Sequence, residues 1–358
     1  AEIGTADVRS GHGKPDMNAL DHKAGTFTAT VENLPQVTPE QREAIVSAPR
    51  TSEMHRAFMA DIPAMSMVET GGAARDATIP QAFTVAAWNL ERGLFPEKSA
   101  ALLASQTPDI VLLTEMDCGM ARTAQRHPTA ELASALGMHY SYGVEFFEIG
   151  LGGETERPYC VDSHNQIGWH GNAVLSRAAP VASVLIRLDD HGHWFVDGDF
   201  VVDPNQPRIG GRMAIATIIP TDAGNICFAS VHLESNGDSA HRAAQTERLI
   251  EALDQFAPDV PVLIGGDLNT GNSRDNPDWR DEALFDLARV NGYSWENNAE
   301  GTTTRPSLLT PHPTRKMKLD WFASRGLSMD GASIIPALDP NGEPLSDHEL
   351  IVGHFGMA

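Results

Sequence analysis

The sequence predicts an α/β protein that folds as a β-rich sandwich. Short apolar runs typical of buried strands outnumber the helical patterns, and polar residues recur where these runs end. Hydrophobic residues make up 41% of the 358 residues, which is enough for a sizeable core. The length fits one large α/β domain or two of average size.

The N-terminal part begins with a polar stretch. Residues 1–37 lack periodicity, and we expect them to be mostly irregular. Thr38, Pro39 and Gln41 predict the start of a helix, because Thr is a good N-cap, Pro fits the first turn and Gln completes a capping box. A second short helix is expected over 52–59.

The next segment, 61–80, is rich in Gly, Ala and Pro and is typical of a linker. We therefore predict two parts of the chain. Residues 1–80 form an N-terminal extension, partly irregular, with one or two short helices. Residues 81–358 form the main domain.

The main domain alternates strands with a few helices. Strands are predicted over 83–88, 109–115, 172–177, 181–188, 213–219, 226–233, 260–267, 319–324 and 348–355. Helices are predicted over 96–105, 239–256 and about 280–291. The strand, helix and strand within 83–115 indicate a βαβ-like unit, and the two strands that flank TDAGN predict a hairpin.

The chain is strongly acidic. Acidic residues outnumber basic ones 48 to 26, which gives a formal net charge of −22. Such a surface repels nucleic acids and anionic membranes unless basic residues gather locally or metal ions intervene. It does not exclude a phosphate substrate, because metal sites are themselves built from carboxylates.

Cysteine usage and hydropathy exclude several classes of protein. Cys118, Cys160 and Cys227 are odd in number and widely spaced, which argues against a disulfide framework or a cysteine zinc site. No apolar run approaches the roughly 20 residues that span a membrane. No signal peptide is visible and the chain begins AEIGT without Met. The localisation is therefore open between the cytoplasm and a periplasmic or secreted location after removal of an N-terminal signal.

Polar side chains stand at the ends of several predicted strands. They are Asn89, Glu115, His232, Asp267, Asn269, Asp320, Asp347 and His348. If they converge, so many carboxylates cannot all stay ionised without a cation. Oxygen ligands of this kind favour Mg²⁺ or Mn²⁺, and Ca²⁺ is also compatible.

Six motifs that contain these residues follow one another in a recognisable order: WNLERG (88–93), LLTEMD (112–117), SVHLES (230–235), GGDLNTG (265–271), KLDWF (318–322) and SDHELI (346–351). Together they resemble the endonuclease/exonuclease/phosphatase superfamily, which includes pancreatic-type deoxyribonucleases, neutral sphingomyelinases and inositol polyphosphate 5-phosphatases. The resemblance covers 83–356. It implies a deoxyribonuclease I-like four-layer α/β sandwich, with two packed, mostly antiparallel sheets flanked by helices. It also implies metal-dependent phosphoester hydrolysis, with 81–358 as the catalytic domain.

The resemblance implies a metal site. Glu115 matches the main metal-binding glutamate of the superfamily, and Asn89 matches the asparagine beside it. Asp347 matches a further metal ligand. The expected cofactor is Mg²⁺ or Mn²⁺.

The resemblance also implies the hydrolytic residues. His232 matches the histidine of the deoxyribonuclease-type members. Asp267 and Asn269 match the pair that handles the attacking water, or the leaving group, and a phosphate oxygen. Asp320 matches the carboxylate that orients His348, which contacts the phosphate. Activation of water is assigned jointly to Asp267 and His348.

Some positions depart from the family pattern or stay open. Glu145 and Glu148 are both candidates for the glutamate that pairs with His232. Asn172 and Arg212 are candidates for contacts to the substrate phosphate, although Arg212 is equally compatible with a solvated loop arginine. The HGH triplet at 191–193 lacks partners at ligand spacing, so we do not expect zinc there.

Three classes of function remain at this point. The net charge favours an enzyme that acts on a small or lipid-like phosphoester. A nuclease for DNA or RNA is the first alternative, because Arg305, Arg315, Lys316 and Lys318 can form a basic rim. A non-catalytic metal-binding scaffold is the second. The oligomeric state is not indicated.

Overall fold

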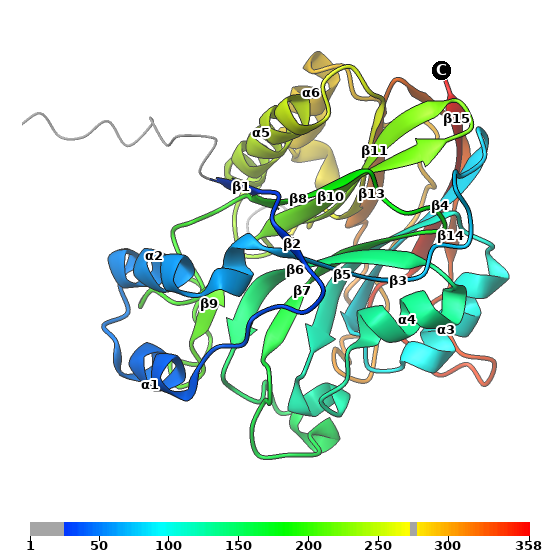
Figure 1. Ribbon diagram of the computed structural model, residues 1–358. Helices are drawn as coiled ribbons and strands as arrows, with labels where there is room; N and C mark the ends of the chain where they lie inside the picture. The colour runs from blue at the N-terminus through cyan, green and yellow to red at the C-terminus, as the bar shows by residue number, and fades with distance from the viewer. Residues whose placement is uncertain (1–24, 273–277) are drawn as a thin grey trace, which may run out of the picture.

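The computed structural model describes residues 25–272 and 278–358. Two β-sheets pack face to face, and helices cover the outer face of each sheet, as Figure 1 shows. A layer of apolar side chains fills the space between the sheets, and a further apolar core lies under the helices on either side. The predicted four-layer α/β sandwich is confirmed.

The first sheet has six strands in the order β1-β8-β10-β11-β12-β13. Their bounds are Thr26–Phe27 (β1), Ala182–Arg187 (β8), Met213–Thr221 (β10), Gly224–His232 (β11), Val262–Asp267 (β12) and Asp320–Arg325 (β13). All neighbours are antiparallel except β11 and β12. The parallel pair places His232 directly beside Asp267 in register.

The second sheet has nine strands, in the order β14-β15-β4-β5-β7-β6-β3-β2, with β9 paired to β6. Their bounds are Leu327–Ile335 (β14), Leu350–Met357 (β15), Phe83–Arg92 (β4), Ile110–Cys118 (β5), Trp169–Ser176 (β7), His139–Glu148 (β6), Val68–Gly72 (β3), Thr30–Val31 (β2) and Arg208–Gly210 (β9). The parallel pair β4–β5 brings Asn89 opposite Thr114, one residue before Glu115.

The helices form the two outer layers (Figure 1). The α-helices are α1 (Pro39–Ser47), α2 (Ser52–Asp61), α3 (Pro96–Ser105), α4 (Pro128–Leu136), α5 (Ser239–Phe256) and α6 (Leu284–Val290). Short 3₁₀ turns occur at Pro63–Ser66, Ala121–Thr123, Arg157–Tyr159 and Trp279–Asp281. Residues of α5 and α6 share a core with the six-stranded sheet, whereas α1 to α4 share one with the nine-stranded sheet.

Most strands of the main domain lie within a few residues of their predicted positions. The βαβ-like unit is β4, α3 and β5, and β10 and β11 form the predicted hairpin. Four elements of the main domain, α4, β6, β9 and β14, were not predicted from the sequence. For α4 the signals were present, since Pro128 begins the helix and Gly137 ends it in the left-handed conformation. For β6, buried acidic residues such as Glu145 obscured the apolar pattern of a strand.

Within the N-terminal part, the predicted helix start is confirmed in detail. The Thr38 hydroxyl accepts from the backbone N–H of Gln41, and the Gln41 side chain accepts from the backbone N–H of Thr38. The linker predicted over 61–80 is wrong, because a 3₁₀ turn and β3 occupy much of it. Val68 of β3 is fully buried, so the glycines of this segment belong to an ordered strand and do not mark a linker.

Residues 25–80 belong to both sheets. β1 covers one edge of the six-stranded sheet by pairing with β8, and β3 with β2 extends the nine-stranded sheet beyond β6. Glu69 on β3 is buried and accepts from the Tyr140 hydroxyl and the backbone N–H of Leu34. The division of the chain at residue 80 stays a prediction, and 81–358 alone would leave both of these edges uncovered.

Candidate active site

The polar residues predicted at strand ends gather at one end of the sandwich. β4 and β5 of one sheet carry Asn89 and Glu115, and the ends of β11, β12 and β13 in the other carry His232, Asp267 and Asp320. All the predicted catalytic and metal residues except Glu115 are buried, and the Glu115 side chain is 19% exposed. The Trp88 indole, beside Asn89 in the chain, donates to the backbone oxygen of His348, 260 positions away, so the fold brings distant segments together here.

The backbone turns sharply at two of these residues. Glu115 has φ +57° and Asn269 has φ +49°, values that non-glycine residues adopt at a cost. The register of β5 against both of its neighbours shifts around Glu115, so this residue sits in a β-bulge. Bulges change the direction of a side chain, and here the bulge aims the carboxylate at Asn89.

His348 is held by a carboxylate. Its Nδ1 lies 2.8 Å from Asp320 Oδ2, and its Nε2 lies 3.5 Å from Asp267 Oδ2. Burial disfavours the charged ring, but the carboxylates of Asp320, Asp267 and Asp347 raise the pKa of His348 well above its usual value. The other oxygen of Asp320, Oδ1, is buried and finds no hydrogen-bond partner among the residues that the structure describes.

Asn89 links two of the carboxylates. Its Nδ2 donates to Glu115 Oε1 at 3.1 Å and to Asp267 Oδ2 at 3.0 Å. Its Oδ1 accepts the backbone N–H of Glu91. In this amide orientation Asn89 positions the carboxylates, and a flipped amide would present its oxygen to a cation instead.

A second imidazole faces Asp267 from the other side. His232 Nε2 lies 3.6 Å from Asp267 Oδ2, and His232 Nδ1 lies 3.2 Å from the Glu145 carboxylate. Of the two glutamates considered for this place, Glu145 pairs with His232, whereas Glu148 binds Arg122. Burial lowers the pKa of His232, as does Arg212, but Glu145 and Asp267 raise it above its usual value.

The two candidates for phosphate contacts have other partners. Arg212 is buried, not solvated, and uses all three guanidinium nitrogens: Nη1 on Glu145, Nε on Glu234 and Nη2 on Ser235. Asn172 donates to the backbone oxygen of Met213 at 3.0 Å. Arg212 therefore holds the Glu145–His232 pair in place, since its Nη1 also lies 2.9 Å from His232 Nδ1.

Two partly exposed arginines bind carboxylates of the cluster. Arg92 Nη1 binds Glu115 Oε2, and Arg315 Nη1 binds Asp347 Oδ2 at 2.6 Å. Burial would raise the pKa of Glu115, but Arg92 and His232 lower it well below its usual value. Glu115 is therefore an ionised carboxylate, as a metal ligand must be. Arg92 stands in the WNLERG motif, but sequence reasoning did not assign it to the site.

Comparison with known proteins agrees with this geometry. Residues 86–348 match the Endonuclease/Exonuclease/phosphatase family. The chain belongs to this family. The family consists of metal-dependent phosphoesterases. No curated protein matches the sequence significantly.

Several solved structures share the family fold. An endonuclease/exonuclease/phosphatase from Beutenbergia cavernae is 18% identical over 78% of this chain and 72% of that chain, with a TM-score of 0.54. The human Nocturnin catalytic domain with a bound sulfate anion is 18% identical over 81% and 98%, with a TM-score of 0.53. A mannosyl-6-phosphatase of Bacteroides thetaiotaomicron is 14% identical over 76% and 99%, with a TM-score of 0.52. At these identities the likeness concerns the fold.

The donor set suits the hard divalent cations that the family uses. Glu115 and Asp267 lie within hydrogen-bond distance of the same amide nitrogen of Asn89, so their oxygens are close together. Burial lowers the pKa of Arg315, but attraction to the carboxylates of Asp347, Asp267 and Glu115 raises it above its usual value. Carboxylates without thiolate are the ligands of Mg²⁺, Mn²⁺ and Ca²⁺. Asp267, Asp320 and His348 also lie close enough to share an ion, but the 2.8 Å contact between Asp320 and His348 is a hydrogen bond that orients the ring.

Glu156 binds Arg92 and so holds the arginine that contacts Glu115. Its Oε1 accepts from Arg92 Nε at 2.8 Å and from Arg122 Nη1 at 3.0 Å. Burial would raise the pKa of Glu156, but Arg92 and Arg122 lower it from 4.5 to about 2. A carboxyl with a depressed folded-state pKa contributes stability that is fully present above its unfolded-state pKa and is lost as the pH falls through the folded-state value.

We therefore expect Glu156→Gln to lower the free energy of unfolding by up to about 3 kcal/mol at pH 7. The difference from the wild type should stay constant down to pH 5 and shrink between pH 4.5 and about 2. Urea unfolding followed by circular dichroism at pH 7, 5, 4 and 3 measures it. Glu154→Gln, at an exposed position, is the control and should change the free energy by less than about 0.5 kcal/mol. A difference that persists undiminished at pH 3 would contradict the ion-pair explanation.

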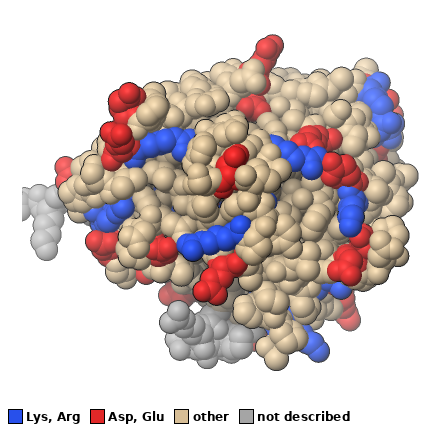
Figure 2. Space-filling view, turned by 90° about the horizontal axis from the view of Figure 1, so that it is seen from below, with Lys and Arg blue, Asp and Glu red and all other residues tan. Residues whose placement is uncertain are grey.

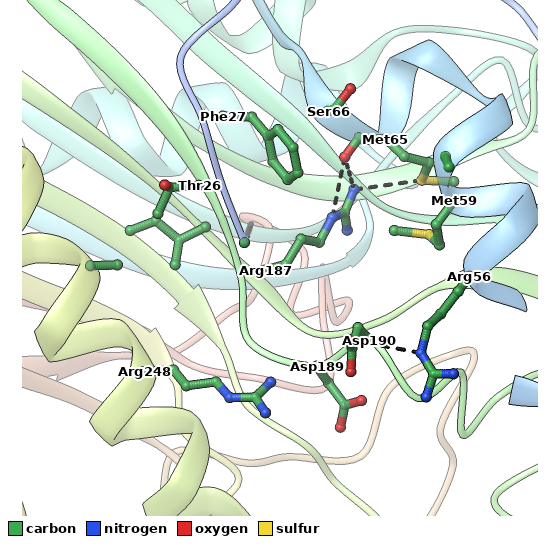
Figure 3. Close-up of a pocket in the computed structure, with 14 residues that line it drawn as sticks. Thr26, Phe27, Arg56, Met59, Met65, Ser66, Arg187, Asp189, Asp190 and Arg248 are labelled. Carbon is green, nitrogen blue, oxygen red and sulfur yellow. Dashed lines mark hydrogen bonds and ion pairs between the residues drawn. The ribbon is translucent and has the colours of Figure 1, made fainter. Parts of the chain in front are cut away.

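Two cavities of different character are relevant to substrate binding. One, of about 730 Å³, is lined by Thr270, which directly follows Asn269, and by Lys318, two residues before Asp320; most of its lining is polar. The other, of about 420 Å³, lies between α2, β8 and α5 and is lined largely by apolar groups such as Phe27, Met59 and Met65 (Figure 3). None of the predicted site residues lines either cavity, but only the first is lined by their neighbours in the chain.

Proposed function

We propose that this chain is a divalent-metal-dependent hydrolase that acts on a small, polar phosphoester. The observation that carries the proposal is the arrangement of His348 between Asp320 and Asp267, beside the carboxylate of Glu115. An oriented imidazole, a second carboxylate that faces it and an ionised metal ligand are the groups that phosphoester hydrolysis requires.

The metal would be held by Glu115 and Asp347, with the Asn89 amide beside them. When bound, it supplies positive charge to a phosphoryl oxygen. Mg²⁺ and Mn²⁺ fit the carboxylate ligands best, and Ca²⁺ is compatible.

The two histidines have complementary tasks. Asp320 fixes Nδ1 of His348, so Nε2 is the atom that reaches the substrate. The raised pKa of His348 suits a donor to a phosphoryl oxygen or to the leaving group. Asp267 lies between His348 and His232 and is placed to accept the proton of the attacking water. Glu145 and Arg212 hold His232 in position.

The charges around the site favour a small substrate over a polynucleotide. Arg305 binds Glu349 at 3.0 Å, and Arg315 binds Asp347, so two members of the expected basic rim are neutralised. Lys318 Nζ donates to the backbone oxygen of Ala299. On the face in Figure 2, basic and acidic side chains are interspersed, and no continuous basic track crosses it. A nucleic acid needs several unpaired cations along its backbone.

The polar cavity beside the site is suited to the organic part of the substrate. Arg280, Lys316 and Lys318 line it together with Glu300 and Trp279. Hydrogen-bonding groups of both charges, with one aromatic ring, fit a sugar- or nucleotide-like group better than an acyl chain. A search of the described helices for a membrane-spanning segment of sufficient length and hydropathy found none.

A substrate panel tests the proposal. Release of phosphate or alcohol is measured with Mg²⁺ or Mn²⁺ on sugar phosphates, nucleotides, p-nitrophenyl phosphate, bis(p-nitrophenyl) phosphate, sphingomyelin vesicles, plasmid DNA and RNA. We expect the highest kcat/KM on a soluble small phosphoester, and a kcat lower by about two to four orders of magnitude with the His348→Ala variant. Preference for DNA or RNA would support the nuclease alternative. No turnover on any substrate, with metal still bound, would favour the non-catalytic scaffold.

A further inference from the structure

A second cluster of potential metal ligands lies outside the catalytic residues. The loop formed by residues 188–207, between β8 and β9, meets the first turn of α5. Asp189 and His193 come from this loop, and His241 comes from α5. Asp189 Oδ2 lies 3.0 Å from His241 Nε2 and 3.4 Å from His193 Nε2. One ligand atom from each of the three residues lies within 4.8 Å of the other two.

We propose that Asp189, His193 and His241 bind one Zn²⁺ ion that fastens the 188–207 loop to α5. Two imidazoles and one carboxylate are ligands typical of zinc, whereas Mg²⁺ and Ca²⁺ prefer oxygen alone. Tetrahedral zinc with bonds of 2.0–2.1 Å separates its ligand atoms by about 3.3 Å. The two contacts of Asp189, at 3.0 and 3.4 Å, are close to that separation.

The groups behind the ligands provide independent support. His193 Nδ1 lies 3.1 Å from Asp199 Oδ2, so the ring can donate its proton to Asp199 and leave Nε2 free to bind the metal. Histidines that bind metals usually donate their other N–H to a carboxylate in this way. The second oxygen of Asp189, Oδ1, accepts the backbone N–H of His191 at 2.8 Å. In Figure 3 the Asp189 carboxylate points away from Arg187.

A competing set of ligands shares one residue with this one. His191, His193 and Asp199 also lie close together. Their side chains are 42%, 24% and 31% exposed, whereas Asp189, His193 and His241 are 14%, 24% and 22% exposed. The more buried set loses less to competition from water. It also joins two separate elements of the fold, which gives the ion a structural effect.

The proposed ion would influence the active site through the residue after His193. Trp194 Nε1 donates to Glu234 Oε2 at 3.0 Å, and the same oxygen accepts from Arg212 Nε at 3.2 Å. Arg212 in turn binds Glu145, the partner of His232. The ion would thus fix a loop whose tryptophan packs against the support of the catalytic histidine. The sequence spacing around HGH does not predict zinc, because His241 is distant in the chain. The fold brings His241 of α5 to His193 and Asp189.

Zinc binding to the full-length protein tests the inference without any measurement of hydrolysis. The metal-stripped protein is placed in excess Mg²⁺, which occupies oxygen-rich sites, and is titrated with Zn²⁺ by isothermal titration calorimetry. We expect one tight zinc equivalent in the wild type and its loss in both His193→Gln and His241→Gln. Asp199→Asn keeps the three ligands and should weaken binding by about 10- to 100-fold. Replacement of Zn²⁺ by Co²⁺ should give the visible absorption of a tetrahedral site in the wild type, but not in His193→Gln or His241→Gln.

Matched controls separate this site from the catalytic one. His354→Gln removes an exposed histidine on β15 and should keep the zinc equivalent. Glu115→Gln removes a ligand of the proposed catalytic metal and should keep it too. Circular dichroism verifies that each variant is folded. Equal zinc stoichiometry in the wild type and both ligand variants, or the absence of a tight zinc equivalent in the wild type, would overturn the inference whatever the outcome for hydrolysis.

Discussion

Replacement of His348 by alanine should lower kcat by about two to four orders of magnitude, the range for loss of a positioned acid–base group. The ring is buried, Asp320 orients it at 2.8 Å, and its free Nε2 faces Asp267 at 3.5 Å. Proton donation by Nε2 of His348 depends on the ring orientation that Asp320 imposes. Steady-state kinetics on the best substrate of the panel measures the effect.

The neighbouring carboxylates should give graded results. Asp267→Ala should cost as much as His348→Ala, because it removes the proton acceptor between the two histidines. Asp320→Asn should cost less, because an amide can still contact the ring although it no longer stabilises the charged form. His354→Ala, at an exposed position later in the same segment of the chain, is the control and should keep wild-type kcat.

The melting temperatures of these variants distinguish catalysis from folding. Removal of Asp267 relieves its repulsion with Asp320 but also removes the acceptor of the Asn89 amide, so we expect only a small net change in melting temperature. If the strand-end residues were only structural polar turns, turnover would remain near normal. Retention of more than about a tenth of wild-type kcat by His348→Ala and Asp267→Ala would show that the assignment is wrong.

Removal of divalent metal should abolish hydrolysis, and Mg²⁺ or Mn²⁺ should restore it. Glu115→Gln should lower kcat by roughly two to four orders of magnitude at saturating Mg²⁺, since a metal that neutralises phosphoryl charge contributes several kcal/mol. Glu115 is the residue to change because the bulge aims its carboxylate into the cluster and Arg92 keeps it ionised.

Dialysis against EDTA, followed by Mg²⁺ titration of the wild type and the variant, measures this effect. The control is Glu247→Gln on the exposed face of α5, which should show wild-type dependence on Mg²⁺. Full activity after exhaustive chelation, confirmed by elemental analysis, would refute a metal-dependent mechanism. Wild-type kcat in Glu115→Gln, with metal dependence retained, would instead show that other carboxylates hold the ion.

The parts of the site that could be predicted are those with a local signature. Asp267 follows the apolar run of β12 and two glycines, and Glu115 ends a run of Ile, Val and Leu, so each stands out where a strand ends. The four layers were implied by the resemblance of these motifs, in their order, to the endonuclease/exonuclease/phosphatase superfamily. Short-range patterns of this kind are visible because strand ends and side-chain alternation depend on adjacent residues.

The parts that could not be predicted depend on contacts between distant strands. Glu145 was one of two candidates, and the sequence could not decide between it and Glu148, because only the packing of the two sheets brings Glu145 to His232. The contacts of Arg212 have the same origin, since its partners lie on two distant segments: Glu145 on β6, and Glu234 with Ser235 after β11. In α4, the chemistry of the helix ends was readable, but a short helix rich in alanine has a weak apolar periodicity.

The covering of the sheet edges by the N-terminal residues has a consequence for the order of folding. In the sheets, Thr26 pairs with Ile186 and Glu69 pairs with Tyr142. The first strands of the described chain can therefore pair only after much later residues have been synthesised. During synthesis these short strands must remain unpaired while β4 and β5 can already associate locally. We expect the edges to close last, in a slow step. Until that step, both sheets expose unpaired backbone to other chains, and this interval is when the protein is most prone to aggregate.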